Sequence, residues 1–415
     1  MPKVWIINQF ANTPDMPGGT RHYEIAKYFS EIGWEVEIFA SDFNLSRRKF
    51  LKIDKLQLFK TEKYSKIKWH WIITFPYQIN NWKRYFNLIS FCLNMLIKQI
   101  QLILKNSFSN SNPDIIIASS PQLPASFVSL LISKILRKKI IFEVRDLSPQ
   151  VLIDMSGFNK KNFFIKFLFW IEEILYKNSS CVVILAKGAK KYVSSKGAKR
   201  IFWLPNGSDL RKFSPLSYPN ENCRFSKKNP FIIIYAGAHG IANDLSNVIK
   251  AAKILINDPI KFVFIGDGPT KNDLILQAQN INNVNFIKAV SKDLIPKKMS
   301  ESNAILISLA DIELFQYGIS PNKLYDAYAI GRPVITAIPG IVNDEVEYYG
   351  LGVTAPAEDP HLLANKIKKL YFKSRIEREA MSRSARKVAE KFYSREKISN
   401  EYINLIDNFI LNKTS

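Results

Sequence analysis

Residues 320–335 read SPNKLYDAYAIGRPVI and contain the start of a helix, its end and the strand that follows it. Pro321 suits the first turn of a helix, where its missing N–H is not needed, and Gly331 suits the helix end. Pro333 then opens a run of β-branched residues, which predicts a strand at 333–338.

Two charged residues lie near the start of this predicted helix. Lys323 and Asp326 are three positions apart, so they share one helix face. A cation at a helix N-terminus can hold a phosphate together with the free N–H groups, and a carboxylate can accept hydrogen bonds from the hydroxyls of a sugar. Without the flanking sequence, the same spacing would indicate an ordinary surface ion pair.

Strands and helices alternate along the rest of the chain in the same way. Short apolar and β-branched runs predict strands at 3–9, 34–41, 114–120, 138–146, 180–186, 200–206, 231–237, 261–268, 284–290 and 304–310. Amphipathic patterns predict the helices between them, among them 19–33, 243–256, 270–281, 291–301 and 321–331. This βαβ rhythm implies parallel sheets covered by helices on both faces.

The rhythm is interrupted once, at 208–230, where Pro, Asn, Ser and Lys occur without a clear period. Such a stretch is typical of a linker. We therefore expect an N-terminal α/β domain at 1–206 and a C-terminal α/β domain at 207–390. A helical tail follows, with a break near 392–394, and we expect its last part, 391–415, to pack back on the N-terminal domain.

The chain has 415 residues, 47% of them hydrophobic, with 16 Gly and 20 Pro. This composition excludes a disordered, collagen-like or coiled-coil protein. The formal net charge is +23, and 31 basic against 14 acidic residues give 1–205 a charge of +17. A positive field of this size attracts nucleic acid, phosphorylated substrates or an anionic membrane.

Cysteine and histidine usage excludes two further classes of site. The three cysteines Cys92, Cys181 and Cys223 lie far apart without a CxxC pair, and the four histidines are scattered. Neither a disulfide framework nor a metal cluster is expected. The first ten residues lack the features of a signal peptide, and polar residues interrupt the apolar stretch 86–104, so we expect a cytoplasmic protein without a membrane span.

Three glycine-containing turns follow predicted strands. Gly18 and Gly19 occupy the first βα turn, where backbone N–H groups could approach an anion or simply form a tight turn. Gly266 and Gly268 form the first two glycines of a dinucleotide fingerprint that lacks its third. The third turn, AGAHG at 236–240, contains a histidine that is either a polar contact or an ordinary loop residue.

The helix ending in AYAIGRPVI resembles the nucleotide-sugar helix of family 4 glycosyltransferases. Further pieces occur in the matching order over nearly the whole chain: GGTRHYEIAKYF, EVRDLSP, LPNGSD, IYAGAHG, FIGDGP and YSREKISNEY. The resemblance extends to bacterial surface-polysaccharide transferases, including L-fucosamine (N-acetylfucosamine) transferases. It implies a GT-B fold, in which two Rossmann-like doubly wound domains with parallel sheets face each other across a cleft.

The resemblance also implies roles for individual residues. The donor nucleotide would bind to the C-terminal domain, the acceptor to the N-terminal one, and transfer would retain the anomeric configuration without a metal or another cofactor. Lys323, Arg145 and Asp146 would be catalytic, and Thr20 and Glu24 would lie on the acceptor side. The donor would contact Gly18, Gly19, Asn206, Gly237, His239, Gly266, Gly268, Ser320, Pro321, Asn322, Lys323 and Asp326.

Several of these assignments have structural alternatives. Arg145 and Asp146 could be an ion pair that holds a loop, Asn206 could shape the hinge, and Glu24 could lie on a solvated helix face. Two positions also depart from the family pattern. Gly318 replaces the first acid of the usual Glu–seven residues–Glu signature, and Asn243 lies near the position where many relatives have a base.

We therefore expect a transferase that moves a sugar, hexosyl or N-acetylhexosaminyl, from a UDP-sugar to a polyprenyl-diphosphate-linked glycan of an O-antigen, lipopolysaccharide, capsule or exopolysaccharide. Basic clusters and aromatic or apolar residues occur together in the N-terminal half, which indicates peripheral contact of this domain with an anionic membrane. The basic clusters lie at 47–49, 137–139, 160–161 and 187–200, the apolar stretch is 163–176, and the aromatics are Trp69, Trp71, Trp82 and Tyr85. The alternatives are a nucleotide-sugar epimerase, a nicotinamide-dependent oxidoreductase and a basic nucleic-acid-binding protein. No nucleic-acid-binding motif was found, so no nucleic-acid partner is expected.

Overall fold

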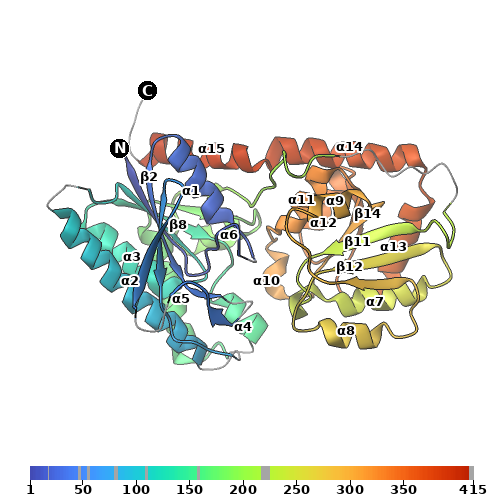
Figure 1. Ribbon diagram of the computed structural model, residues 1–415, viewed down its shortest axis with the longest axis horizontal. Coiled ribbons are helices and arrows are strands. Elements are labelled where there is room, and N and C mark those ends of the chain that lie inside the picture. The colour runs from blue at the N-terminus through green and yellow to red at the C-terminus, as the bar shows by residue number, and fades with distance from the viewer. Residues whose placement is uncertain are drawn as a thin grey trace. The chain divides into compact units, whose positions relative to one another are not determined.

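The computed structural model describes residues 1–16, 18–44, 48–53, 57–78, 83–107, 111–156, 159–215 and 225–410. The chain forms two compact units (Figure 1). Unit 1 comprises Met1–Leu204 and Ser399–Ser415, and unit 2 comprises Pro205–Ile398. Each unit contains its own open sheet flanked by helices, which agrees with the α/β fold class predicted from the sequence.

Unit 1 is built on an eight-stranded sheet of order β10-β9-β8-β7-β1-β2-β6-β5. All neighbours pair in parallel except β5, which pairs with β6 in antiparallel fashion. The strands are β1 (Lys3–Ile7), β2 (Glu35–Ser41), β5 (Phe59–Tyr64), β6 (Ile67–Ile72), β7 (Ile115–Ser119), β8 (Lys139–Val144), β9 (Cys181–Ile184) and β10 (Ile201–Trp203). A separate hairpin joins β3 (Phe43–Asn44) and β4 (Lys49–Phe50).

The sequence pattern did not predict strand β6, and its two tryptophans correct the prediction that they contact a membrane. Trp69 and Trp71 are fully buried in the core of unit 1, so they cannot contact a membrane surface. Polar residues between them obscured the strand pattern. His70 Nε2 and Lys68 Nζ lie 3.2 and 3.4 Å from the carboxylate of Glu37 on β2, so these polar side chains are paired inside the sheet. Trp82 lies outside the described residues.

Helices connect the strands of unit 1. They are α1 (Arg21–Glu31), α2 (Lys83–Ser107), α3 (Leu123–Ile135), α4 (Gln150–Ser156), α5 (Phe163–Asn178) and α6 (Ala189–Ser195). Helix α15 (Arg395–Leu405), followed by a π-helical turn (Ile406–Ile410), begins in unit 2 and continues into unit 1. There, the ring of Tyr402 lies 6.3 Å from that of Phe29 on α1.

A buried acid on α5 makes the stability of unit 1 depend on pH. Glu172 is fully buried, and burial raises its pKa to about 7 although the hydroxyls of Tyr176 and Tyr192 donate to its carboxylate at 2.9 and 3.0 Å. The ionised form is therefore disfavoured in the folded state. The resulting loss of stability grows as pH rises from the ordinary value of 4.5 and is complete above 7.

Glu172→Gln is expected to stabilise the protein at pH 8 by up to about 3 kcal/mol and to have little effect near pH 4.5. Urea unfolding at both pH values measures the difference. The matched control is Glu173→Gln on the same helix, where the exposed carboxylate pairs with Lys177 and should contribute little. Equal effects of Glu172→Gln at both pH values would contradict the prediction.

Unit 2 is built on a six-stranded parallel sheet of order β13-β12-β11-β14-β15-β16. The strands are β11 (Phe231–Ala236), β12 (Ile260–Ile265), β13 (Val284–Ile287), β14 (Ala304–Ser308), β15 (Val334–Ala337) and β16 (Gly352–Ala355). Numbered from β11, this is the 3-2-1-4-5-6 order of the dinucleotide-binding doubly wound fold. The predicted strands of this half all occur, and β16 was not predicted.

Helices cover both faces of the unit 2 sheet. On one face, α7 (Leu245–Ile254), α8 (Lys271–Gln277) and α13 (Pro360–Phe372) share an apolar core with the strands. α9 (Ile295–Ser300) and α11 (Asn322–Ile330) pack against each other (Figure 1). The remaining elements are a 3₁₀ turn (Ile241–Asn243), α10 (Glu313–Gln316), α12 (Val342–Tyr348) and α14 (Arg375–Phe392).

The ends of helix α11 agree with the local sequence signals. Helix α11 was expected at 321–331 and spans Asn322–Ile330, preceded by Pro321. Gly331 ends it in the left-handed region, with φ of 64°, and its N–H bonds to carbonyls of the last turn. This conformation is readily available only to glycine. The expected break in the C-terminal tail lies between α14 and α15, at 393–394.

Candidate active site

The strand order of unit 2 reverses between β11 and β14. In open α/β sheets, ligands bind beyond the carboxyl ends of the strands at such a switch point. The segments after these two strands meet there, because the N–H of Ala310 donates to the carbonyl of Ala242 at 3.1 Å. Helix α11 follows β14 and brings the predicted donor residues to the same region.

Lys323 lies in the first turn of α11 and reaches the segment after β11. Its ammonium group donates to Asn243 Oδ1 at 2.5 Å and to the Tyr235 hydroxyl at 3.0 Å, and it lies 4.6 Å from the centre of the Tyr235 ring. Burial lowers the pKa of Lys323 to about 7. Within the described part of the chain no carboxylate pairs with it, so the cation has only neutral partners.

Asn243 also explains one departure from the family pattern. It lies near the position where many relatives are expected to have a base, and here its side-chain amide accepts from Lys323. The other departure, Gly318, follows α10 in a turn with φ of 87°, and its N–H donates to the Phe315 carbonyl at 3.0 Å. The cation beside Asn243 is therefore Lys323, which belongs to α11.

Ser320 and Asp326 each bind a residue of the segment 205–208. The backbone N–H of Asn206 donates to Ser320 Oγ at 2.8 Å, and its side-chain amide donates to the Ser320 carbonyl at 2.6 Å. The Ser208 hydroxyl donates to Asp326 Oδ1 at 2.6 Å. Desolvation of the partly buried carboxyl raises the pKa of Asp326 to about 6. The structure thus brings the predicted residues Asn206 and Ser320 together.

The two glycine turns of unit 2 pack against each other. A Cβ atom on Gly266 would lie 1.9 Å from the carbonyl oxygen of Gly237, and one on Gly268 would lie 2.2 Å from that of His239. Only glycine permits this backbone contact. Gly237 also lies near the cation, since a Cβ there would be 3.7 Å from Lys323 Nζ.

His239 is fully buried in this loop pair. Its ring lies about 6 Å from the rings of Tyr235 and Phe286, and neither ring nitrogen has a hydrogen-bond partner among the described residues. Burial is the main cause that lowers its pKa. A donor contact of His239 would therefore require access that the described loop does not provide.

The predicted residues of unit 1 follow strands β1 and β8. Gly18 has a φ of 111° and precedes α1, and the Thr20 hydroxyl donates to Glu24 Oε1 at 3.3 Å across the first turn of that helix. After β8, Asp146 is exposed and Arg145 is half-buried. Within the described residues these two side chains form no ion pair. The Ser120 hydroxyl accepts from both of their backbone N–H groups, at 2.9 and 3.2 Å.

Sequence reasoning missed the buried charge network of unit 1. Glu143 at the end of β8 is fully buried; its carboxylate accepts from Arg21 at 3.0 Å and lies 3.1 Å from His22 Nε2. Arg21 also donates to the carbonyl of Leu204 at 2.9 Å. The Arg21 charge holds the pKa of Glu143 well below its ordinary value, despite burial. Arg21 directly follows Gly18–Thr20, so its ion pair with Glu143 holds the predicted glycine turn close to the end of β8.

The remaining hydrogen bonds of this network fit a neutral histidine. Burial lowers the pKa of His22. Its Nδ1 lies 3.3 Å from the Asn8 amide nitrogen, so the tautomer with the proton on Nε2 accepts from Asn8 and donates towards Glu143. The sequence signal for this network is the pair Arg21-His22, which comes soon after the Gly-Gly turn.

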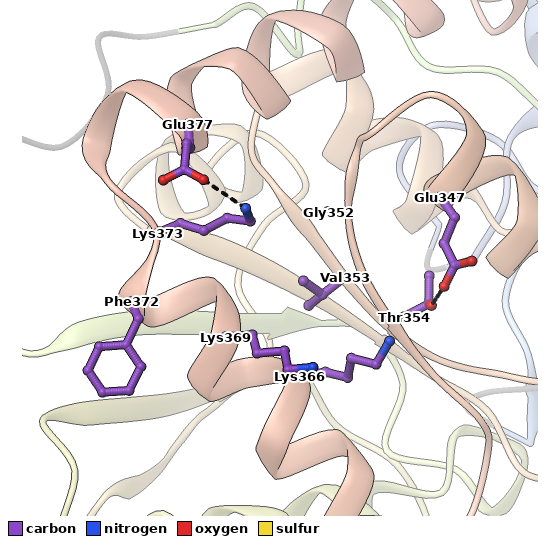
Figure 2. A pocket seen from close by; sticks show the side chains of 9 residues that line it. All are labelled: Glu347, Gly352, Val353, Thr354, Lys366, Lys369, Phe372, Lys373 and Glu377. Atoms are coloured by element: carbon purple, nitrogen blue, oxygen red, sulfur yellow. Dashed lines mark hydrogen bonds and ion pairs between the residues drawn. The ribbon is translucent and has the colours of Figure 1, made fainter.

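A pocket of about 510 Å³ lies elsewhere in unit 2, between β16, α13 and α14 (Figure 2). Figure 2 shows Lys366 and Lys369 on its α13 side and the Lys373–Glu377 ion pair of 2.9 Å at its edge. None of the predicted donor residues lines it. Among the described residues, no group of three His, Cys, Asp or Glu side chains has a metal-binding arrangement.

Comparisons with known proteins agree with this architecture. The model of the family "Glycosyl transferases group 1" matches residues 221–388. A relative in Escherichia coli strain K12, named as the colanic acid biosynthesis glycosyl transferase WcaI, is 23% identical over 292 residues, which are 67% of this chain and 69% of the relative.

Two solved structures show the same fold over the full chain. Sucrose-phosphate synthase from Thermosynechococcus elongatus has a TM-score of 0.77 at 15% identity and covers 100% of both chains. HepE from Anabaena, solved in complex with UDP, has a TM-score of 0.68 at 16% identity and covers 98% of this chain and 100% of its own. Residues 221–388 therefore match the glycosyl transferases group 1 family, and the chain as a whole has a GT-B fold.

Proposed function

We propose that the protein is a glycosyltransferase that takes its sugar from a UDP-linked donor held by unit 2. The observation that carries the proposal is Lys323, a desolvated cation with only neutral partners in the first turn of α11. A diphosphate is the complementary ligand, because it would supply the missing negative charge where α11 directs its free N–H groups. The complexes of HepE with UDP and UDP-glucose support a nucleotide donor.

The proposed chemistry is release of the nucleoside diphosphate and transfer of the sugar to a hydroxyl, with retention and without a metal. The leaving diphosphate gains negative charge as the glycosidic bond breaks, and the Lys323 ammonium group with the backbone N–H groups of Ser320, Asn322 and Lys323 would stabilise it. Asp326 would accept hydrogen bonds from the ribose hydroxyls. Asp146 of unit 1 would orient or deprotonate the acceptor hydroxyl, with Arg145 beside it.

The proposed acceptor is a lipid-linked oligosaccharide of a bacterial surface polysaccharide, reached from the cytoplasmic side of the membrane. The name of WcaI places that relative in colanic acid biosynthesis, which is such a polysaccharide pathway. The +17 charge of residues 1–205 suits an anionic membrane and a lipid diphosphate. Whether the sugar is hexosyl or N-acetylhexosaminyl would be determined by the donor loops.

A panel of nucleotide sugars tests the proposal. Thermal shift identifies the donor, and incubation with a polyprenyl-diphosphate-linked glycan then measures transfer with and without EDTA, with the product anomer determined by NMR. We expect stabilisation by UDP-sugars, EDTA-resistant transfer and retention. The proposal would be overturned if the protein converted a nucleotide sugar to its epimer without an acceptor. It would also be overturned if none of the nucleotide sugars bound.

Asp326→Ala is expected to raise the donor KM by about tenfold or more, because it removes the proposed acceptor for the ribose hydroxyls. Since the pKa of Asp326 is about 6, the wild-type donor KM should rise as pH falls below 6, when the carboxylate becomes protonated. Asp326→Asn should lose that dependence. Steady-state kinetics from pH 5 to 8 measure both.

Ser208→Ala is the matched control. This variant keeps the Asp326 carboxylate but removes a hydroxyl that lowers its pKa. The rise of the donor KM in acid should therefore begin at a higher pH than in the wild type, with little change in KM at pH 8. Unchanged donor kinetics in Asp326→Ala would refute the ribose assignment.

A further inference from the structure

Helix α2 presents a continuous apolar stripe to solvent. Six large apolar side chains on it are 43–63% exposed and recur every three or four residues: Phe86, Ile89, Leu93, Ile97, Ile100 and Leu104. That spacing places them on one side of the helix over about 27 Å. The solvent side of a helix in a globular protein normally carries polar and charged residues. An apolar stripe of this length indicates a surface that another phase or molecule covers.

Two neighbouring helices extend this surface. α3 packs against both α2 and α5, and the three helices lie on the same side of unit 1 (Figure 1). On α3, Leu131 and Ile135 are exposed, and on α5, Phe163, Phe167 and Trp170 are exposed. We call these five side chains and the α2 stripe together the α2–α5 apolar face.

Aromatic contacts join the helices beneath this face. The Trp170 ring lies 5.9 Å from that of Phe127 on α3, and Phe164 lies 4.7 Å from Tyr85 on α2. Trp170, 51% exposed, also stacks on Phe167. The face is therefore part of one packed layer, and its exposed side chains are held in place by the folded unit.

The charges around the α2–α5 apolar face are almost all positive. No Asp or Glu occurs between Glu62 and Asp114, a range that includes all of α2, while α2 itself carries Lys83, Arg84, Lys98 and Lys105. Of the two acids on α5, Glu172 is buried and Glu173 is paired with Lys177 at 2.5 Å. α3 contains one charged residue, Lys134.

We propose that the α2–α5 apolar face is the surface by which unit 1 lies in the headgroup region of an anionic bilayer. An apolar stripe on helices bordered by Lys and Arg has the chemistry of interfacial membrane-binding helices. A second copy of this chain fits less well, because pairing the two faces would bring the cations of both together. The inference rests on the proposed membrane contact and assigns it to named helices.

The buried side of α2 indicates that this helix lies in the membrane interface and does not cross the membrane. By length and composition, α2 is the one helix among the described residues that could span a bilayer. Its inner side is fixed in unit 1, however: Phe91, Met95 and Gln99 are fully buried. The buried Asn87 amide also donates to Thr74 Oγ1 at 2.8 Å and to the Phe75 carbonyl at 2.7 Å. Crossing would expose these groups, whereas insertion of the outer stripe leaves the fold intact.

Vesicle binding of the purified full chain tests the proposal. We expect flotation with phosphatidylcholine vesicles that contain phosphatidylglycerol, less with phosphatidylcholine alone, and release by salt. The variant Leu93→Gln/Ile97→Gln/Ile100→Gln should bind at least about tenfold more weakly, since it removes apolar groups that enter the interface. These side chains are about half exposed, so the melting temperature should remain near that of the wild type.

The matched control is Ile254→Gln/Ile275→Gln/Leu276→Gln in unit 2. These residues are 42–60% exposed, like the three on α2, but they belong to α7 and α8. We expect this control to float like the wild type. Equal loss of binding in both triple variants would overturn the proposal, because general surface hydrophobicity would then explain the binding.

The fluorescence of Trp170 tests the proposal without depending on whether the α2 triple variant folds. Lipids brominated in their acyl chains should quench its fluorescence when the wild type binds, and Trp170→Phe should lose most of the quenching while still floating. Wild-type protein that does not float, or a stable dimer that the α2 triple variant converts to a monomer without vesicle binding, would overturn the proposal. These experiments contain no nucleotide, so their failure is distinguishable from failure of donor binding, which thermal shift measures separately.

Discussion

Replacing Lys323 with methionine is expected to weaken binding of the nucleotide donor by about a hundredfold, because the variant loses a charge-assisted contact to the diphosphate. The loss should appear in the donor Kd, measured by calorimetry, and in kcat/KM. In the wild type, affinity should also decline as pH rises above 7, since the pKa of Lys323 is about 7 and the ammonium group then loses its proton. Lys323→Met should lack this alkaline decline.

The same variant should not lose stability in the absence of donor. Burial lowers the pKa of Lys323 from its ordinary 10.5, so the charged side chain is destabilising in the empty protein at pH 7, and that cost disappears as pH rises from 7 towards 10.5. Methionine removes the charge but leaves Asn243 and Tyr235 without their shared donor. We therefore expect a melting temperature equal to or slightly above that of the wild type.

A lysine on the surface of the same unit serves as control. Lys253→Gln changes an exposed side chain on α7 and should alter neither donor affinity nor its pH dependence. A Lys323→Met variant that folds and binds UDP-sugars as tightly as the wild type would remove the observation on which the proposed function depends.

Glu143→Gln is expected to destabilise unit 1 by about 3–5 kcal/mol, because it removes the charge of a buried carboxylate that is ion-paired with the nearly buried guanidinium of Arg21. Urea unfolding at pH 7, monitored by the fluorescence of the buried Trp5, Trp69 and Trp71, measures the loss. The pKa of Glu143 in the folded protein lies well below its ordinary 4.5. The stabilisation is therefore fully present above pH 4.5 and is lost as pH falls, so the difference between wild type and variant should shrink in acid.

An exposed acid on α1 provides the comparison for this effect. Glu31→Gln breaks a solvent-exposed pair with Lys27 at 3.8 Å and should change the free energy of unfolding by less than about 0.5 kcal/mol. If Glu143→Gln were as mild as Glu31→Gln, the buried network would not be what fixes the start of α1 at the end of β8.

Local sequence patterns predicted the fold class and most of its elements. The positions of Pro321 and Gly331 predicted α11 to within one residue at each end, because helix ends depend on the conformations that single residues permit. Strands β5 and β6 were missed because their polar residues pair with partners on neighbouring strands. The burial of Trp69 and Trp71 depends on the same strand pairing, so the sequence pattern did not predict it.

The sequence by itself determined that the chain alternates strands with helices and that Lys323 and Asp326 share one face at the start of a helix, because periodicity and spacing are local properties. Only the tertiary structure decided what surrounds them. It placed Tyr235 and Asn243, both about eighty residues earlier, against Lys323, and so left that cation without an acidic partner among the described residues. It also decided that α2 turns Phe91 and Met95 inward and Leu93 and Ile97 outward. An apolar helix has several sides that could be buried, and which of them stays exposed depends on how the sheet and the neighbouring helices pack against it.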